Sequence, residues 1–213
     1  ALLVRIANID DGSLGKPEEA IAAYKKVLEL DSSNSRALHA LDALFTRQQL
    51  WSDLAENLEA QLSLSNDDTE QLQIMLRLAA LREREMNQVE QAIEGYRSVL
   101  ERDAGNHEAL SALERLGTDA RYELAIADML EPLYRQSGNY QKLIGAHEIQ
   151  VRLSEDVVRR VELLTQIAQL HEDATNDVNS AFGTMLRALN EYPANEATQR
   201  TLERLARATG RYG

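Results

Sequence analysis

Apolar residues recur every three or four positions through most of this chain, which is the spacing of one face of an α-helix. In the segments 21–28 and 38–45, Tyr24 and Leu28 lie on the apolar face of the first and Leu41 on that of the second. The apolar residues are mainly Leu and Ala, and the 213 residues include only three prolines and 5% aromatic side chains. Together these features predict an all-α protein.

Short polar connections separate the helical segments. Their Asn, Asp and Ser residues are types that cap helices. Pro17 suits the first turn of a helix, and Gly138 suits the end of one helix before Tyr140 opens the next. The cap-rich connections are 31–34, 65–68, 103–106 and 193–195. The breaks predict helical hairpins at about 1–30, 35–65, 69–103, 107–154 and 156–192, with a last helix at about 196–208.

Internal repeats appear when the sequence is compared with itself. At a shift of 72 residues, Tyr24 aligns with Tyr96 and Asn34 with Asn106, without a gap over nearly forty residues. A weaker third copy of this unit follows at a shift of 161. A second type of unit repeats at a shift of 89, where the aligned pairs include Trp51 with Tyr140 and Leu64 with Leu153. The two unit types therefore alternate along the chain.

The fourth predicted unit is longer than the others by about seventeen residues, the difference between the shifts of 89 and 72. We interpret the excess as an additional helix, so that 107–116 and 119–136 are separate helices, divided at residues 117–119. Pro132 then lies inside the second of them. Because proline removes a backbone hydrogen bond, we expect a kink there.

These residues resemble the tetratricopeptide repeat family, whose unit is a 34-residue helix-turn-helix. Residues 15–31 look like the second helix of that unit, with Ala20 as its small residue and Tyr24 as its aromatic one. Residues 89–103 repeat this match. The first-helix pattern of the family appears within 3–7, 75–79 and 164–168.

The chain departs from the family pattern at three positions. Asp42 stands where the family prefers a small residue, and Leu54 and Leu143 replace the small residue of the second helix. The resemblance implies an all-α, right-handed α-solenoid of about five hairpins plus a terminal helix, with one irregular long unit near 107–137. We expect one repeat domain over 1–213. The start at Ala1 resembles the middle of a helix, so we interpret the chain as a fragment of a longer protein.

The formal net charge is −12, which disfavours binding to nucleic acid or to anionic lipid. The chain has no cysteine and therefore no disulfide, thiolate nucleophile or Cys-ligated zinc. No apolar run approaches the roughly 18 residues of a membrane span. We expect a soluble protein of bacterial type, with the cytoplasm slightly favoured.

Motifs for catalysis or metal binding are weak in this chain. None of its four histidines lies three or four residues from another. The triplet 171–173 (His-Glu-Asp) could supply part of a metal or acid/base site, but the end of a polar helix explains it more simply. The segment 8–13 lacks the ligand spacing of a calcium loop and is interpreted as a turn. We predict no enzyme activity, no metal and no cofactor.

The predicted function is a protein–protein interaction scaffold that binds a peptide or partner protein on a concave surface, as the resemblance implies. Helix geometry places candidate groove positions on three first helices, where arginines would suit carboxylates. They are Arg36, His39, Arg47, Arg77, Arg84, Gln166 and Gln169. Ordinary pairing of these arginines with glutamates on the same helix is the simpler alternative.

Trp51 and Tyr140 are either partner anchors or packing residues, and packing is favoured. The Lys/Asn pattern with which tetratricopeptide chaperone cofactors hold a C-terminal carboxylate is absent, since His39 and Ala43 occupy its first positions. Two alternatives for the function remain open. One is a structural module that self-associates into homo-oligomers, and the other is a recruiting domain of a larger enzyme.

Overall fold

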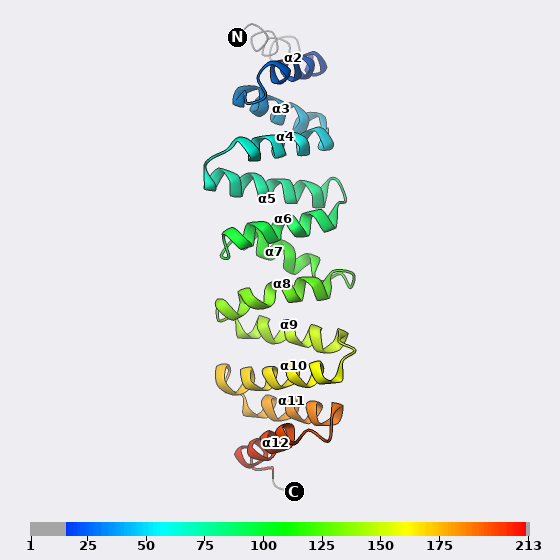
Figure 1. Cartoon of the computed structure of the whole chain (residues 1–213), viewed down its shortest axis with the longest axis vertical. Helices are drawn as coiled ribbons and strands as arrows, with labels where there is room; N and C mark the ends of the chain where they lie inside the picture. Colours follow the sequence, from blue (N-terminus) through cyan, green and yellow to red (C-terminus); the bar gives the residue numbers. More distant parts are fainter. Residues whose placement is uncertain (1–15, 212–213) are drawn as a thin grey trace. The chain divides into compact units, whose positions relative to one another are not determined.

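The computed structural model describes residues 16–211, which form eleven α-helices and one π-helical segment and contain no strand. The all-α prediction is therefore confirmed for this part of the chain (Figure 1). The predicted first helix and the turn at 8–13 lie outside the described residues. The elements are α2 (Pro17–Leu30), α3 (Ser35–Gln48), α4 (Trp51–Leu64), α5 (Asp68–Arg84), α6 (Val89–Arg102), α7 (His107–Leu116), α8 (Glu123–Gln136), α9 (Tyr140–Leu153), α10 (Val157–Gln169), η1 (Leu170–Ala174), α11 (Val178–Glu191) and α12 (Glu196–Ala208).

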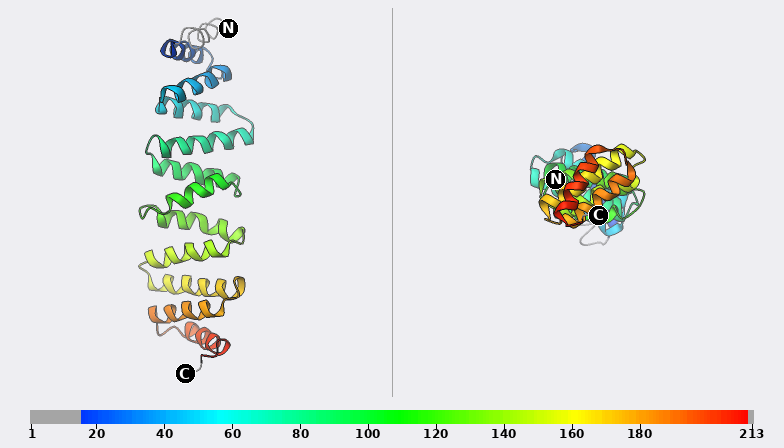
Figure 2. Two further views of the ribbon diagram at one scale, coloured as in Figure 1. Left: turned by 180° about the vertical axis from the view of Figure 1, so that it is seen from behind. Right: turned by 90° about the horizontal axis from the view of Figure 1, so that it is seen from below.

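The chain divides into two compact units, the first ending at Ala112 and the second beginning at Leu113, within α7. In the first unit, α2 to α5 each pack against the next helix, and in the second unit α8 to α11 do the same. Figure 1 shows α4, α5 and α6 side by side, and Figure 2 shows the same neighbours from behind. Each unit has its own apolar core, around Leu41 and Leu58 in the first and around Leu164 and Ile167 in the second.

Side-chain caps begin the helices at all four predicted polar connections. The four capping side chains are Asn34, Asp67, Asn106 and Asn195, and each accepts a hydrogen bond from a backbone N–H of the helix that follows. Pro17 occupies the first turn of α2, as predicted. Gly138 has φ +68°, a conformation that favours glycine, and it ends α8 immediately before α9. Local sequence therefore determines where most of these helices begin.

The long unit contains the additional helix, but the predicted range 119–136 was wrong at its start, since α8 begins only at Glu123. The Asp119 carboxylate accepts a hydrogen bond from the backbone N–H of Arg121 at 3.0 Å, and the Asp119 carbonyl accepts from Tyr122 and Glu123. These bonds hold 119–122 as a turn. Helix α8 continues through Pro132. The kink there stays a prediction.

Side-chain contacts repeat at the shift of 89 residues even where the residues themselves differ. Lys25 forms an ion pair with Asp53 at 2.6 Å, and 89 residues later Glu114 pairs with Lys142 at 2.5 Å, with the two charges exchanged. The same shift relates the contact of Arg102 with Gln71 to that of Glu191 with Arg160, and the left-handed residue Asn87 to Asn176. Helices α3 to α6 therefore have equivalents in α8 to α11, and polar positions in the two units can be compared one by one.

Candidate functional site

Asp42 is the centre of a polar cluster between α3, α4 and α5. Its carboxylate accepts two hydrogen bonds from the guanidinium of Arg77, at 2.6 and 2.5 Å. The same guanidinium donates to Thr46 at 3.3 Å, and the Gln61 amide donates to Asp42 at 3.3 Å. The Asp42 side chain is 12% exposed and that of Arg77 is 48% exposed. The first unit therefore contains a bidentate ion pair in which the acid is buried.

A cleft of about 430 Å³ lies among α8, α9, α10 and η1 in the second unit. We call it the η1 cleft, and its lining is mostly polar. It is lined by Arg135, Tyr140, His147, Gln166, Gln169, Leu170, Asp173 and Ala174. The predicted pair Gln166 and Gln169 therefore lies in one cleft, which the sequence patterns alone did not reveal.

The η1 cleft corresponds to the Asp42 cluster. At the shift of 89, the equivalents are Glu131 for Asp42, Arg135 for Thr46, Gln150 for Gln61, and Gln166 for Arg77. The acid and the buried glutamine are retained, but the arginine of α5 is replaced by the uncharged Gln166 of α10. Among the residues that the structure describes, Gln166 makes no hydrogen bond to Glu131. No internal cation on α10 therefore occupies the position that Arg77 has in the first unit.

His147 has one buried ring nitrogen without a partner. The side chain is 1% exposed, and its Nδ1 lies 2.8 Å from Oε1 of Gln150. The Gln150 amide nitrogen donates to Asp128 at 2.7 Å, so Oε1 must be the acceptor and His147 Nδ1 the donor. In the neutral ring Nε2 then carries no proton and can only accept a hydrogen bond. Within the described residues this atom has no hydrogen-bond partner.

Glu131 lies beside His147 with an altered acidity. Burial alone would raise the pKa of Glu131, but hydrogen bonds from Arg135 and Gln150 outweigh it and hold the pKa below its ordinary value. The Arg135 bond is 2.7 Å long and the Gln150 bond 3.4 Å. Glu131 is therefore a carboxylate at neutral pH, and it contributes negative charge behind the cleft.

The η1 segment forms one wall of the cleft. Its backbone is π-helical, with the Thr175 N–H donating to the Leu170 carbonyl five residues earlier. Such segments are rare and often lie at functional sites. Arg204 of α12 holds η1 through two hydrogen bonds to Glu172, and these bonds lower the pKa of Glu172. His171 Nδ1 is a second buried ring nitrogen without a partner in the described chain.

The remaining predicted groove residues are dispersed. Arg36, Arg47 and Arg84 are exposed on α3 and α5. His39 lines a separate hollow of about 200 Å³, and its Nδ1 lies 2.7 Å from the Ser35 carbonyl. Arg77 is the exception, since it binds Asp42 rather than a glutamate of its own helix. The structure therefore brings together Gln166 and Gln169, whereas the predicted arginines do not line a common cleft.

The equivalent aromatic residues Trp51 and Tyr140 have different surroundings. Trp51 packs against the first core, which agrees with the packing interpretation. Tyr140 is 41% exposed and lines the η1 cleft. Sequence reasoning had not selected Arg135 or His147 as site residues. Aligning the two units over their full length would have drawn attention to them, because they replace Thr46 and Leu58.

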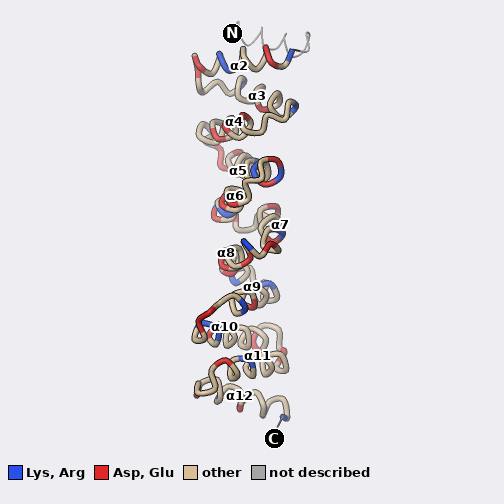
Figure 3. The backbone as a smooth tube through the Cα atoms, turned by 90° about the vertical axis from the view of Figure 1, so that its right-hand side faces the viewer, with Lys and Arg blue, Asp and Glu red and all other residues tan. Residues whose placement is uncertain are grey.

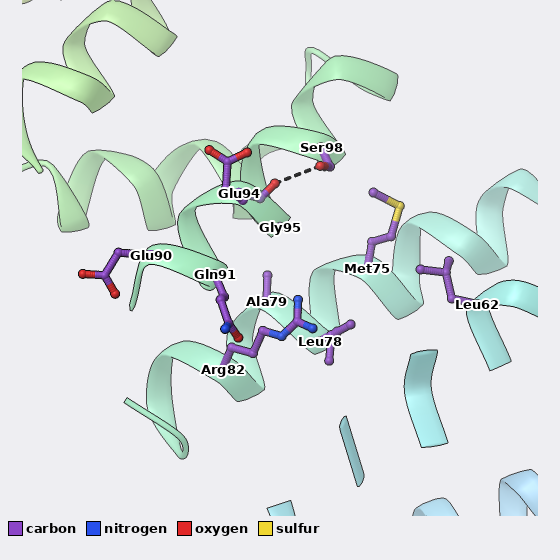
Figure 4. A pocket seen from close by; sticks show the side chains of 10 residues that line it. All are labelled: Leu62, Met75, Leu78, Ala79, Arg82, Glu90, Gln91, Glu94, Gly95 and Ser98. Atoms are coloured by element: carbon purple, nitrogen blue, oxygen red, sulfur yellow. Dashed lines mark hydrogen bonds between the residues drawn. The ribbon is translucent and has the colours of Figure 1, made fainter. Parts of the chain in front are cut away.

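A more apolar hollow of about 490 Å³ lies chiefly against α5 and α6 in the first unit. Figure 4 shows Met75, Leu78 and Ala79 along one helix and Gly95 along the other. A Cβ on Gly95 would lie 2.8 Å from the Ala79 Cβ, so the close approach of these helices requires glycine. At the rim, Arg82 already binds Glu59. This hollow offers fewer directed polar groups than the η1 cleft.

Acidic residues are distributed over the described helices. Each labelled helix in Figure 3 carries at least one acidic residue. No group of three or more potential metal ligands occurs within residues 16–211, where Glu172 of the triplet 171–173 binds Arg204. Over the same residues, every helix is too short or too polar to cross a membrane.

Residues 73–106 match the tetratricopeptide repeat family. The match covers one helical hairpin, formed by α5 and α6, and the described part of the chain is a succession of such hairpins. No curated protein sequence matches the chain.

Several solved structures are similar to the chain, all at low sequence identity. The MamA protein is 19% identical over 89% of this chain and 90% of its own, with a TM-score of 0.38. The P58(IPK) TPR domain is 14% identical over 98% and 55%, with a TM-score of 0.43. PilF of Pseudomonas aeruginosa is 18% identical over 95% and 80%, with a TM-score of 0.34. None of these similarities identifies what this chain binds.

Proposed function

We propose that this protein is a protein–protein interaction scaffold that holds a peptide or partner protein on the concave face of its helical array. The observation that carries the proposal is the η1 cleft. It combines an unpaired buried nitrogen of His147 with the amide groups of Gln166 and Gln169. A buried polar atom without a partner is costly, and a ligand that binds there would remove the cost.

The exposed residues Arg36, His39, Arg47 and Arg84 are proposed as further contacts in the first unit. Their charge suits acidic side chains of a partner. Arg77 has about half of its side chain exposed. Because its guanidinium is bound to Asp42, its main role in this proposal is to hold α3 and α5 together. The first unit would then contribute broad electrostatic contacts, and the η1 cleft a specific one.

The test is selection of peptides from an unbiased display library against the full chain, followed by affinity measurement with Gln166→Arg. We expect selected peptides to bind this variant at least tenfold more weakly, because the longer side chain fills the cleft. Gln48→Arg is the matched control, since it adds the same charge at an exposed position of α3. Enrichment of no peptide, or equal binding to both variants, would refute the proposal.

Light scattering over a concentration range tests the alternative of self-association. A chain that remains monomeric in the presence and absence of a selected peptide agrees with the scaffold. A chain that forms a defined homo-oligomer, and loses its peptide affinity when the oligomer forms, would favour the structural module instead.

A further inference from the structure

The position of Arg77 indicates what kind of group the equivalent cleft can accept. In the first unit its guanidinium lies between Asp42 and Thr46 and donates to both side chains. In the second unit the acid is retained as Glu131, but α10 supplies Gln166 in place of the arginine. The acid is thus bound by an arginine in both units, but only in the first does that arginine come from the helix equivalent to α10, and the second unit leaves a cleft at Gln166.

The unpaired atom of His147 is complementary to a hydrogen-bond donor. Because Nδ1 must donate to Gln150, Nε2 of the neutral ring can only accept. A carboxylate ligand has only acceptor atoms and would face this lone pair directly. A guanidinium has five N–H donors and no acceptor.

The charges around the cleft also favour a cation. Arg135 and Asp173 line it, and Asp128 and Glu131 accept hydrogen bonds from Gln150, which binds His147. These groups comprise three carboxylates and one guanidinium. Arg135 is already bound to Glu131 at 2.7 Å. Arg204 also acts electrostatically on Asp173, but its guanidinium is bound to Glu172. Asp128 and Asp173 therefore leave a net negative charge near the cleft.

We propose that the η1 cleft binds an arginine side chain of the partner protein. The incoming guanidinium donates to His147 Nε2 and to the Asp173 carboxylate, and the side-chain oxygens of Gln166 and Gln169 accept its remaining N–H groups. Lysine fits less well, because a compact ammonium cannot reach acceptors on η1, α9 and α10 together. This inference rests on the proposed scaffold function.

The test uses blocked arginine (N-acetyl-arginine N-methylamide) titrated into the full chain labelled with ¹⁵N in its histidines. The His147 ring signal is identified by its loss in His147→Leu. We expect a saturable shift of the Nε2 signal with blocked arginine, and at least tenfold weaker binding of blocked citrulline, which has nearly the same shape without the charge. Blocked lysine should also bind more weakly than blocked arginine.

Variants assign the binding to the cleft. Gln166→Arg should abolish the shift, because the new guanidinium occupies the position itself, and Asp173→Asn should weaken binding several-fold. Gln48→Arg adds the same charge as Gln166→Arg outside the cleft and should leave the binding of blocked arginine unchanged. Equal binding of citrulline and arginine, or a His147 shift caused by blocked glutamate instead, would overturn the arginine assignment.

The two proposals fail in different ways. Selected peptides that depend on the cleft but contain no arginine would overturn this inference and leave the scaffold function standing. Binding of blocked arginine without enrichment of any peptide would support the cleft chemistry and contradict the scaffold function.

Discussion

The Asp42 cluster and the η1 cleft are two versions of one arrangement, 89 residues apart. In the first, Arg77 closes the space between α3 and α5 with a bidentate ion pair. In the second, Gln166 leaves a cleft with an unpaired nitrogen of His147 behind it. The difference teaches that repeat units keep a fold with either set of polar residues. In the first unit the acid is bound by an arginine of another helix, whereas in the second it is bound by Arg135 of its own helix and the cleft retains an unpaired histidine nitrogen.

Removal of the internal arginine should have the largest effect on stability. Arg77→Ala leaves the buried Asp42 carboxylate without its cation, and we expect a loss of about 2 kcal/mol after allowance for the exposed half of the arginine. Urea unfolding followed by the fluorescence of Trp51, the single tryptophan, reports on this unit. Arg36→Ala is the control and should change stability by less than about 0.5 kcal/mol. Equal losses in the two variants would show that the ion pair has no special role.

Introducing an arginine at Gln166, the position equivalent to Arg77, should increase the stability of the chain by less than Arg77→Ala decreases it. Gln166→Arg places a guanidinium near Glu131, and we expect a gain of about 1 kcal/mol from charge-assisted hydrogen bonds. Competition with Arg135 for the same carboxylate limits the gain. Urea unfolding followed by circular dichroism measures it, with Gln48→Arg as the control for added charge. A less stable Gln166→Arg chain would contradict the equivalence of the two sites.

The exchanged ion pairs Lys25–Asp53 and Glu114–Lys142 should contribute least to stability. The side chains of these pairs are between 31% and 50% exposed, so a double-mutant cycle on either should give a coupling of about 0.5 kcal/mol. The charge-reversed double variant Lys25→Asp/Asp53→Lys should recover most of the stability that either single change removes. A coupling that persists unchanged in high salt would disagree with this assignment.

Lowering the pH should reduce the stability of the second unit, because Glu131 becomes protonated. Because the folded-state pKa of Glu131 is lowered, its stabilising contribution is complete above the ordinary value of 4.5 and is lost as the pH falls through the folded-state pKa. The stability difference between the unchanged chain and Glu131→Gln should therefore be greatest near about pH 6 and shrink below 4.5. Thermal unfolding at a series of pH values measures it, and a difference independent of pH would refute the contribution.

The sequence predicted the helices better than the site. Asp42 looked like a departure from the family pattern, and Arg77 was a candidate groove residue with pairing to a glutamate of its own helix as the alternative. The two side chains form one ion pair across 35 residues, and no helical periodicity reports a contact of that kind. Gln166 and Gln169 were selected from helix geometry and do share a cleft. His147 was missed because a lone histidine on an apolar helix face resembles any other core residue.

The helices, their caps and the repeat shifts were determined by the sequence alone, because apolar periodicity and capping residues act within a few neighbouring positions. The tertiary structure decided which polar residues meet. Whether Gln150 faces Asp128, or His147 keeps a nitrogen unpaired, depends on how α8, α9 and α10 pack. Packing brings together residues about twenty positions apart or more, and their pairing sets the chemistry that the cleft presents to a partner.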